Sequence, residues 1–532
     1  MIRGSAFVMA AVMVATAIIG CGRTKPVAGD GAVPPVDRPF DITGVPDGPG
    51  DSNVGDAFVE HDAGGGGPCD AGNSGAGATE GAWFYVLPPV ADHALRPGDD
   101  LALIQRRTSV LGASADGSVV VGTSEFDLLG PVGELRSVMS GIEIFRWTVA
   151  TGVVGLGFPA SIRPTDPRFG VCSVLGISAD GSVVLGTCTG PQGPVAIRWT
   201  PCSGIVVIDA PAGTSRLTPN AMTPDARVMI GNLKVGGLSG PMKAFRWSAE
   251  TGVEILDLPT GHDQSSAWTM TADGNIVFGT AFSPDGDHAA FRWSREIGSV
   301  ALPRLPAHIA CGITERGPLV DGDVAAGNCY QGDRIHGYHW TAAAGTVALG
   351  MPAGTVDTEV TELSRDGAVI MGWARGPAVS SAFRWTAATG AVIVSPAGAA
   401  RAMSDDGAVI AGDFDFEGGV RAFRWTDGPG TVALPLLAGD VQGTVTNVSR
   451  DGSIVTGTSY RINGASAPAD LPVAVYWDRA GAVHSIAGGL RAVGVDLGGT
   501  LLTSATSPDG KVFWGDARTS EGERRAWVGR AP

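Results

Sequence analysis

Hydrophobic and polar positions alternate in short runs along most of the chain, and the clearest example is 361–395. There a polar Ser-Arg-Asp-Gly segment at 364–367 is followed by an apolar run that ends in Gly372. A second apolar run carries Ala-Phe-Arg-Trp at 382–385, and a Thr-Gly pair at 389–390 precedes a third. Asp-Gly is a strong hairpin signal because both residues tolerate positive φ. The pattern predicts four short antiparallel strands joined by tight turns.

The same pattern recurs nine times between about residue 108 and the C-terminus. Eight copies keep an Asp in the first turn and a Gly six residues later: Asp116/Gly122, Asp180/Gly186, Asp225/Gly231, Asp273/Gly279, Asp366/Gly372, Asp406/Gly412, Asp451/Gly457 and Asp509/Gly515. Eight copies keep a Trp in the third strand: Trp147, Trp199, Trp247, Trp293, Trp340, Trp385, Trp425 and Trp477. These tryptophans are 40 to 52 residues apart, the length of a four-stranded propeller blade. The sequence therefore predicts an all-β fold, with a β-propeller of about eight or nine four-stranded blades over 83–532.

The two ends of this array are incomplete in complementary ways. The ninth copy stops at 526–532, before any fourth strand, whereas 83–88 is an apolar β run with no strands before it. This run resembles the fourth strand at 253–259, which also ends in Leu-Pro. We therefore expect 83–88 to complete the last blade, because that pairing removes two open sheet edges. The alternative is an isolated apolar run at the boundary of the preceding segment.

The third strand places an Arg between a Phe and a Trp. Phe and Trp share one face of the strand, so the Arg points to the other face, which a stacked blade also covers. We expect this Arg, for example Arg384, to pair with the turn Asp of the same or a neighbouring blade, such as Asp366. The fifth copy lacks both partners, since Arg316 stands in place of the Asp and His339 stands in place of the Arg. The eighth copy keeps the Asp but has Tyr476, so the correlation is incomplete. A functional ring of arginines is the alternative interpretation.

The N-terminal segment has the features of an export signal. Arg3 precedes an apolar run at 6–19 that is too short for a comfortable membrane span. The run ends in Ile-Ile-Gly-Cys at 18–21, which resembles the lipobox of bacterial lipoproteins. The resemblance implies a signal peptide at 1–20, acylation of Cys21, and an anchor in the outer membrane, since no Asp follows the cysteine. An ordinary cleaved signal with an incidental cysteine is the alternative.

Composition separates the segment after Cys21 from the repeats. Residues 21–82 are rich in Gly, Pro, Asp and Ala, and such a segment buries too little apolar surface to offset its ordering entropy. We predict a disordered linker there. The whole chain has 53 acidic and 37 basic residues, a formal net charge of −16. Nucleic acid and anionic membrane surfaces repel such a protein, so nucleic acid is not an expected partner.

Apart from Cys21, the chain has six cysteines, an even number that suggests disulfides in an exported protein. Cys188 and Cys329 each lie two residues beyond the Gly of the second strand, and Cys172 and Cys311 each begin a first strand. These positions face each other across a hairpin. We therefore predict the disulfides Cys172–Cys188 and Cys311–Cys329. Cys69 and Cys202 are left as a third pair that the spacing does not settle.

A search for catalytic or metal-binding motifs identifies none. The His-Glu-x-x-His, Gly-x-Ser-x-Gly and phosphate-loop patterns are absent from the sequence. The run from Asp413 to Glu417 resembles the opening of a calcium loop, but Arg424 stands where the bidentate Glu belongs. Solvated turns are the preferred interpretation of this run and of the Asp pairs at 285–287 and 321–323, with bound calcium as the alternative. No cofactor is predicted.

The third strands with Ala-Phe-Arg-Trp, at 244–247, 290–293, 382–385 and 422–425, resemble the bacterial extracellular repeat called the HAF family. The name-giving His occurs at one copy only, His336 before Gly-Tyr, so this is a variant form. The resemblance covers about 80% of the chain, from the first repeat onward. It implies a propeller of the cell envelope or a secreted propeller. It implies no reaction and no catalytic residue.

Two functions from different classes are consistent with this sequence. The preferred hypothesis is a non-enzymatic envelope lipoprotein, periplasmic or surface-exposed, whose propeller binds a protein or a polysaccharide. The loops at 126–140 and 461–472 differ most between copies, and variable loops on a rigid scaffold are common recognition sites. The alternative is an envelope glycosidase or lyase that uses carboxylates at the channel. Convergent carboxylates and aromatic residues in one pocket would favour the enzyme, whereas a channel of Val, Gly and Ala would favour the binder.

Overall fold

The computed structural model describes residues 82–90, 102–129, 137–162, 170–190, 193–307, 310–313, 322–377, 380–395, 397–416, 419–461 and 472–530. These residues belong to one compact unit, Gly65–Pro532. The predicted signal peptide, Cys21, Cys69 and the predicted linker up to residue 81 lie outside the described residues. Within the described part of the chain, no helix is long and apolar enough to cross a bilayer.

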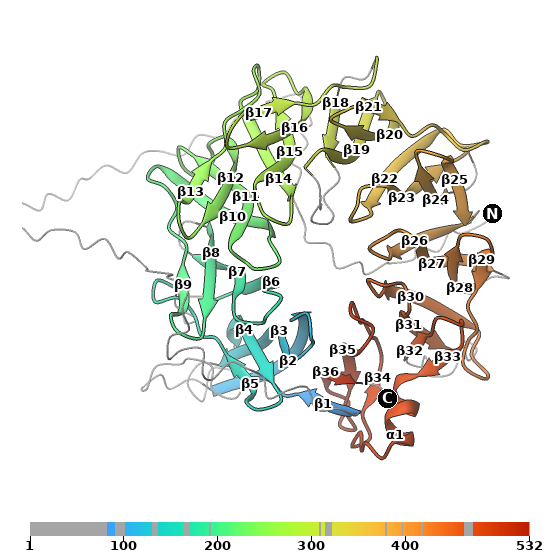
Figure 1. Cartoon of the computed structure of the whole chain (residues 1–532). Coiled ribbons are helices and arrows are strands. Elements are labelled where there is room, and N and C mark those ends of the chain that lie inside the picture. Colours follow the sequence, from blue (N-terminus) through green and yellow to red (C-terminus); the bar gives the residue numbers. More distant parts are fainter. Residues whose placement is uncertain are drawn as a thin grey trace, which may run out of the picture. The chain divides into compact units, whose positions relative to one another are not determined.

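The described residues form nine antiparallel blades of four strands each, arranged around a ring in Figure 1. Blade 1 contains β2 (Ala102–Ala113), β3 (Val119–Leu129), β4 (Ser137–Thr148) and β5 (Gly152–Gly155). Blade 2 contains β6 (Cys172–Ile177), β7 (Val184–Gly190), β8 (Gly193–Thr200) and β9 (Gly204–Val207). Blade 3 contains β10 (Thr214–Met222), β11 (Val228–Val235), β12 (Met242–Ser248) and β13 (Gly252–Ile255).

Blade 4 contains β14 (Gln264–Met270), β15 (Ile276–Phe282), β16 (His288–Ser294) and β17 (Gly298–Ala301). Blade 5 contains β18 (Ala310–Ile313), β19 (Val324–Gln331), β20 (Arg334–Thr341) and β21 (Gly345–Ala348). One parallel pair, His288 with Ala310, joins these two blades into a continuous sheet. Blade 6 contains β22 (Asp357–Leu363), β23 (Val369–Arg375), β24 (Ser380–Thr386) and β25 (Gly390–Ser395).

Blade 7 contains β26 (Gly398–Met403), β27 (Val409–Phe416), β28 (Gly419–Thr426) and β29 (Gly430–Ala433). Blade 8 contains β30 (Gln442–Val448), β31 (Val455–Tyr460), β32 (Val473–Trp477) and β33 (Val483–Ser485). The helix α1 (Ile486–Ala492) follows; Ser485 caps it by accepting the Gly488 N–H at 3.1 Å. Blade 9 contains β34 (Leu501–Leu502), β35 (Val512–Arg518), β36 (Arg524–Arg530) and, as its fourth strand, β1 (Trp83–Leu87).

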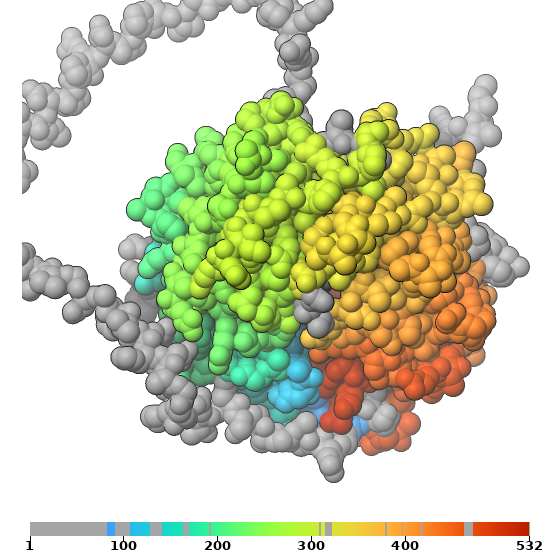
Figure 2. Space-filling view, turned by 45° about the horizontal axis from the view of Figure 1, so that its top comes forward, coloured from blue at the N-terminus to red at the C-terminus, as the bar shows by residue number. Residues whose placement is uncertain are grey.

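Pairing of the two ends closes the ring. β1 runs antiparallel to β36, with Trp83 opposite Arg530 and Leu87 opposite Ala526. Each blade contacts the next along the chain, and β36 of blade 9 contacts β2 of blade 1. In Figure 2 the red C-terminal strands adjoin the blue N-terminal ones. The predicted propeller and its closure through 83–88 are therefore confirmed, and the described residues contain nine blades.

The first turn is built around an Asp in the eight blades that keep this residue. In blade 6, Asp366 accepts hydrogen bonds from the Ser364 hydroxyl at 2.6 Å and from the Ala368 N–H at 3.0 Å. The Ser364 hydroxyl in turn accepts the Val369 N–H at 2.9 Å. Gly367 completes the turn with φ +74°, a conformation that favours glycine. The carboxylate of Asp366 therefore accepts its hydrogen bonds from residues of its own turn.

The Gly in the middle of the second strand lies opposite a bulge in the first strand. The register of β22 against β23 shifts between Val360 and Glu362, opposite Gly372. A Cβ on Gly372 would lie 2.1 Å from the Glu359 carbonyl oxygen and 2.7 Å from the ring of Phe383. The Gly therefore marks where the ring of the third-strand Phe comes close to the backbone of the second strand.

Arg384 reaches the turn of the neighbouring blade, as predicted, but its hydrogen bond goes to the backbone of that turn. Beside the hydrogen bond from Ser404, its positive charge also helps to lower the pKa of Asp406, the turn carboxylate of blade 7. Arg384 donates from Nε to the carbonyl oxygen of Gly407, the turn Gly of blade 7, at 3.2 Å, and its guanidinium lies 5.0 Å from the Trp425 ring centroid. The equivalent bonds are Arg246–Gly274, Arg292–Gly322 and Arg424–Gly452, each 2.8 Å, and His339–Gly367, 3.2 Å. Arg292 adds a 3.4 Å contact to Asp323. A backbone carbonyl accepts equally from Arg and His, which explains the exchange in the fifth copy.

Both predicted disulfides, Cys172–Cys188 and Cys311–Cys329, are present and join the first two strands of blades 2 and 5. Their partners are directly opposite in the strand register. Cys202 lies in an exposed turn. Structural disulfides are typical of proteins that fold outside the cytoplasm, so the chain has the character of an extracytoplasmic protein.

Backbone bonds between the first turns line one end of the central channel, which we call the turn face. Ala115 donates its N–H to Ala179 O at 2.8 Å, and Ala179 donates to Pro224 O at 2.7 Å. A second series runs from Arg365 to Asp405, from Asp405 to Arg450 and from Arg450 to Pro508, at 2.8 to 2.9 Å. Each series ends at a proline because proline has no N–H to donate.

Candidate functional site

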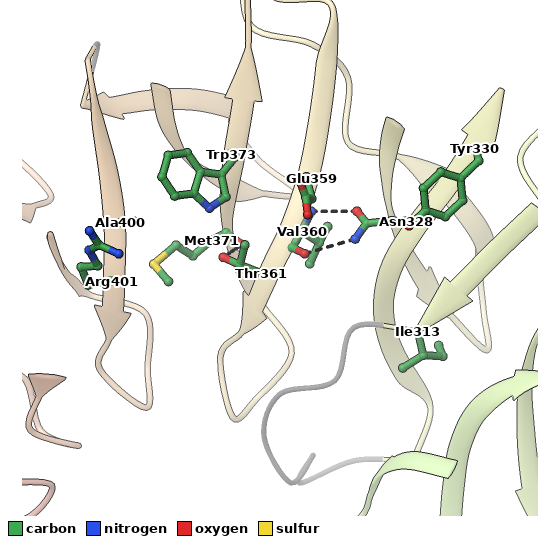
Figure 3. Close-up of a pocket in the computed structure, with 10 residues that line it drawn as sticks. All are labelled: Ile313, Asn328, Tyr330, Glu359, Val360, Thr361, Met371, Trp373, Ala400 and Arg401. Atoms are coloured by element: carbon green, nitrogen blue, oxygen red, sulfur yellow. Dashed lines mark hydrogen bonds between the residues drawn. The ribbon is translucent and has the colours of Figure 1, made fainter. Parts of the chain in front are cut away.

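A cavity of about 420 Å³ opens on the inner wall of blades 5 to 7, and we call it the blade 5–7 pocket. The first two strands of blades 5 and 6 and the first strand of blade 7 supply its ten lining residues. They are Ile313, Asn328, Tyr330, Glu359, Val360, Thr361, Met371, Trp373, Ala400 and Arg401. In Figure 3 the indole of Trp373 lies between Arg401 and Glu359, and Tyr330 lies on the far side of β22.

Two aromatic rings in this pocket are incompletely buried. Tyr330 is 40% exposed, and Trp373 is half-buried. Six of the eight third-strand Trp residues are buried, for example Trp385 at 6% and Trp340 at 7% exposed, whereas Trp199 and Trp425 are half-buried. A large aromatic ring left open to a cavity is available to a ligand.

Trp373 departs from the repeat at a position that otherwise holds a small polar residue. The residues that directly follow the second-strand Gly in the nine blades are Thr123, Thr187, Asn232, Thr280, Asn328, Trp373, Asp413, Thr458 and Asp516. Several of them accept a backbone N–H from the next blade. Asn232 accepts from Ala267 at 3.1 Å, and Asn328 accepts from Val360 at 2.8 Å. Trp373 has no side-chain oxygen for this purpose and presents its indole to the cavity instead.

The bonds of Asn328 hold the floor of the pocket. Its amide nitrogen donates to Val360 O at 3.2 Å while its amide oxygen accepts the Val360 N–H, as the dashed lines in Figure 3 show. The disulfide Cys311–Cys329 lies beside Asn328 in sequence and ties β18 to β19. Ile313, Asn328 and Tyr330 are therefore presented by a cross-linked pair of strands.

Arginine–carboxylate pairs supply the charge of the pocket. Arg375 donates from Nη2 to Glu359 Oε2, and Arg401 donates from Nε to Asp413 Oδ2 at 2.8 Å. Asp413 also accepts the Val445 N–H of blade 8 at 2.6 Å. Burial raises the pKa of Asp413, and burial together with the charge of Glu359 raises the pKa of Tyr330. Each arginine thus meets its own carboxylate, and the pocket carries little net charge.

None of the site residues predicted from the sequence lines this pocket. Arg384 belongs to the packing between blades, and Asp366 lies in its own exposed turn. The eight repeat tryptophans lie on the third strands of blades 1 to 8. Of the predicted site residues, Cys311 and Cys329 come nearest to the lining. Trp373, Tyr330 and Arg401 were missed. The signal for Trp373 is its size at a position where the other copies have Thr, Asn or Asp.

A second cavity, also about 420 Å³, lies at the turn face, and we call it the turn-face mouth. One side of the mouth comes from blades 1 to 3 and is small and apolar, with Ala115, Ala179 and Pro224 among its residues. The other side comes from blades 6 to 8 and is polar, with Ser364, Arg365, Ser404, Asp405 and Arg450 among them. Because opposite blades line the same cavity, the channel is narrow at this end.

Several of the carboxylates considered for calcium are engaged by protein groups, whereas Asp321 and Glu417 lie outside the described residues. Asp413 pairs with Arg401, Asp287 pairs with Arg304 at 2.5 Å, and Asp285 accepts the Ser283 hydroxyl at 2.7 Å. Among the residues that the structure describes, no group of three or more His, Cys, Asp and Glu side chains is placed to hold a metal ion.

Comparison with known proteins adds no family. No protein-family model matches the sequence, and a comparison with curated proteins gives no match either. The resemblance to HAF repeats therefore stays a prediction.

Solved structures that resemble the chain include propeller proteins. A prolyl endopeptidase matches with a TM-score of 0.39 and 12% identity over 68% of this chain and 55% of its own, so about half of that enzyme is covered. TolB from Acinetobacter baumannii matches with a TM-score of 0.29 and 16% identity over 62% of this chain and 82% of its own. The β-propeller domain of the trilobed protease from Pyrococcus furiosus matches with a TM-score of 0.31 and 12% identity over 57% and 94%. At these scores no activity or partner carries over.

Proposed function

We propose that the protein is a non-enzymatic envelope lipoprotein that binds a polysaccharide in the blade 5–7 pocket. The observation that carries this proposal is Trp373, a large half-buried aromatic residue facing a cavity at a position where the repeat otherwise has a small polar side chain. Tyr330 adds a second exposed ring on the opposite side of β22.

A sugar ring has an apolar face of C–H groups and an edge of hydroxyl groups. The flat rings of Trp373 and Tyr330 match the apolar face. The charged side chains of Glu359 and Arg401 provide an acceptor and donors of strong hydrogen bonds for hydroxyl groups. A protein ligand would be expected to bury a larger and more continuous apolar surface than this cavity supplies.

The glycosidase form of the enzyme alternative finds less support in this pocket. Hydrolysis with general acid catalysis requires two carboxyl groups that flank the scissile bond. Of the ten residues that line the pocket, Glu359 is the one carboxylate, and it is paired with Arg375. Asp413 is paired with Arg401, is 5% exposed and does not line the pocket. The lining residues include aromatic rings that can pack against a sugar, but they do not include the two carboxyl groups that hydrolysis requires.

The test of the binding function uses the full mature protein on a glycan array. Wild-type protein should bind a subset of glycans, and Trp373→Asn should lose at least ten-fold in affinity. The Asn side chain also matches Asn232 and Asn328, so this variant should keep its thermal stability. Thr187→Asn, at the equivalent position of blade 2, is the matched control and should bind like wild type. Failure of wild type to bind any glycan, or equal binding by Trp373→Asn, would contradict the proposal.

The envelope location is a separate part of the proposal, supported by the lipobox-like 18–21 and by the two disulfides. Attachment to the outer membrane would proceed through acyl chains on Cys21. Cells grown with radiolabelled palmitate should give a labelled membrane-bound protein, and Cys21→Ser should be unlabelled. An unlabelled wild-type protein would remove the lipid anchor from the proposal and leave the binding function untouched.

A further inference from the structure

We infer that the polysaccharide is a linear, uncharged chain. The binding site holds about four of its sugar units along β22 and β26, from the blade 5–7 pocket to the turn-face mouth. This inference rests on the proposed function and names the class of ligand. It starts from the two cavities, which are lined by consecutive residues of the same two strands.

The continuity of the lining is visible in both strands. In and beyond β22, residues 359–361 line the pocket and 362–365 line the mouth. In and beyond β26, residues 400–401 line the pocket, and 403–405 line the mouth. We call these two segments, 359–365 and 400–405, the channel groove. Six residue steps of a strand extend about 20 Å, roughly the length of four sugar units in a linear chain.

The charges along the groove point to an uncharged ligand. Arg375 pairs with Glu359, Arg401 pairs with Asp413, and Arg365 pairs with Asp405 at 3.5 Å. Glu362 and Arg450 add one charge of each sign at the mouth. A groove with compensated charges offers many hydrogen bonds without a net attraction for anions, although the whole chain is acidic.

The shape of the mouth favours an extended chain over a compact ligand. Residues from blades 1 to 3 face the groove across the mouth with small apolar groups, among them Ala115, Ala179 and Pro224. A chain that passes between the two sides would have polar contacts on one side and apolar contacts on the other. These two sides match the hydroxyl edge and the apolar face of a sugar ring. Trp373 and Tyr330 then define the end of the groove away from the turns.

The test is a ladder of cello-oligosaccharides and N-acetylchito-oligosaccharides of one to six units, titrated against the full mature protein. For at least one ladder, affinity should rise with length and level off near four units. The double variant Arg365→Ala/Asp405→Ala should weaken binding of the four- to six-unit members about ten-fold while the two-unit member binds as before. Trp373→Asn should weaken binding at every length. Thermal melting of each variant shows whether it is folded.

The outcomes separate this inference from the function on which it rests. Affinity that stops rising at two units, or a mouth variant that binds the long members like wild type, would overturn the extended groove and keep the pocket. Binding confined to polyanionic glycans would overturn the uncharged ligand. Displacement of the bound sugar by an extended peptide such as polyalanine, at equal or higher affinity, would assign the groove to a protein segment. Absence of binding to any saccharide would remove the proposed function itself.

Discussion

Blades 2 and 5 have the same scaffold and differ in what the scaffold presents. Each has a disulfide at the same register, Cys172–Cys188 in one and Cys311–Cys329 in the other. In blade 2 the residues on either side of the second cysteine are Thr187 and Thr189, and in blade 5 they are Asn328 and Tyr330. Only the second pair lines the blade 5–7 pocket. The repeat therefore sets the backbone, and substitutions at two positions beyond the second-strand Gly create the site.

The largest expected effect comes from removing the disulfides. The loops they close span 16 and 18 residues, so Cys172→Ser/Cys188→Ser and Cys311→Ser/Cys329→Ser should each lower the free energy of unfolding by about 3 kcal/mol. Only the blade 5 variant should also weaken saccharide binding, because its cross-link holds Ile313, Asn328 and Tyr330. Urea unfolding followed by tryptophan fluorescence, together with saccharide titration, measures both. If the two double variants bound saccharide equally well, the disulfide of blade 5 would have no special role in the site.

Alanine at the second-strand Gly should have the next largest effect. A Cβ would lie 2.4 Å from Ser173 O at Gly186 and 2.1 Å from Glu359 O at Gly372. Both substitutions should therefore lower stability by about 2 kcal/mol, a typical cost of overpacking. Gly372→Ala should also displace Trp373 and reduce affinity, whereas Gly186→Ala should leave affinity as it is. Chemical unfolding and titration of both variants check this pair.

A smaller effect is expected for the bond between blades made by Arg384. Arg384→Ala removes a hydrogen bond to Gly407 O and a contact with the Trp425 ring, and should lower stability by about 1 kcal/mol. Arg384→His should recover part of the loss, because His339 makes the equivalent bond in blade 5. Thermal melting compares the three proteins. A histidine variant no more stable than the alanine variant would mean that the aromatic contact, and not the carbonyl, holds the side chain.

The smallest effects concern acid stability in blade 7, where two carboxylates shift in opposite directions. The hydrogen bond from Ser404, at 2.6 Å, and the Ala408 N–H lower the pKa of Asp406, whereas burial raises the pKa of Asp413. The contribution of Asp406 is therefore complete above its ordinary pKa of about 4 and is lost as the pH falls below it. The stability gap between wild type and Ser404→Ala should narrow on acidification.

Asp413 should show the reverse dependence. Its folded state takes up a proton more readily than the unfolded chain, so its contribution is greatest below about pH 4 and declines as the pH rises through the raised pKa. The stability of wild type relative to Asp413→Asn should therefore decrease from acid to neutral pH. Unfolding midpoints of the three proteins between pH 3 and 7 measure both trends. Parallel curves for the two variants would contradict the assignment.

Much of the fold was predictable because the repeat encodes it locally. The Asp-Gly turns, the Gly that accommodates the bulge and the apolar run at 83–88 each specify a backbone geometry within a few residues. The two disulfides follow from hairpin register alone. The helix α1 was missed, because Gly488 and Gly489 weaken the helical signal of a short segment.

The site was not predictable in the same way, because it is assembled from three blades. Tyr330, Trp373 and Arg401 lie on separate blades and meet only when the ring is built. The hydrogen-bond acceptor of Arg384 was not predictable for a related reason, since the backbone carbonyl of Gly407 does not appear in a pattern of side chains. Trp373 alone was recoverable, by aligning the copies at the Gly and looking for the residue that breaks the pattern.

The two prolines at the turn face have a mechanical consequence. Because Pro224 and Pro508 donate no N–H, the series of turn-to-turn bonds stops at blade 3 and again where the last blade meets the first. The amino-terminal end of the propeller is held in blade 9 by five residue pairs between β1 and β36. Force applied to the amino-terminal end of the propeller would therefore act first on the β1–β36 pairing. These two strands would separate while the remaining blades stay assembled.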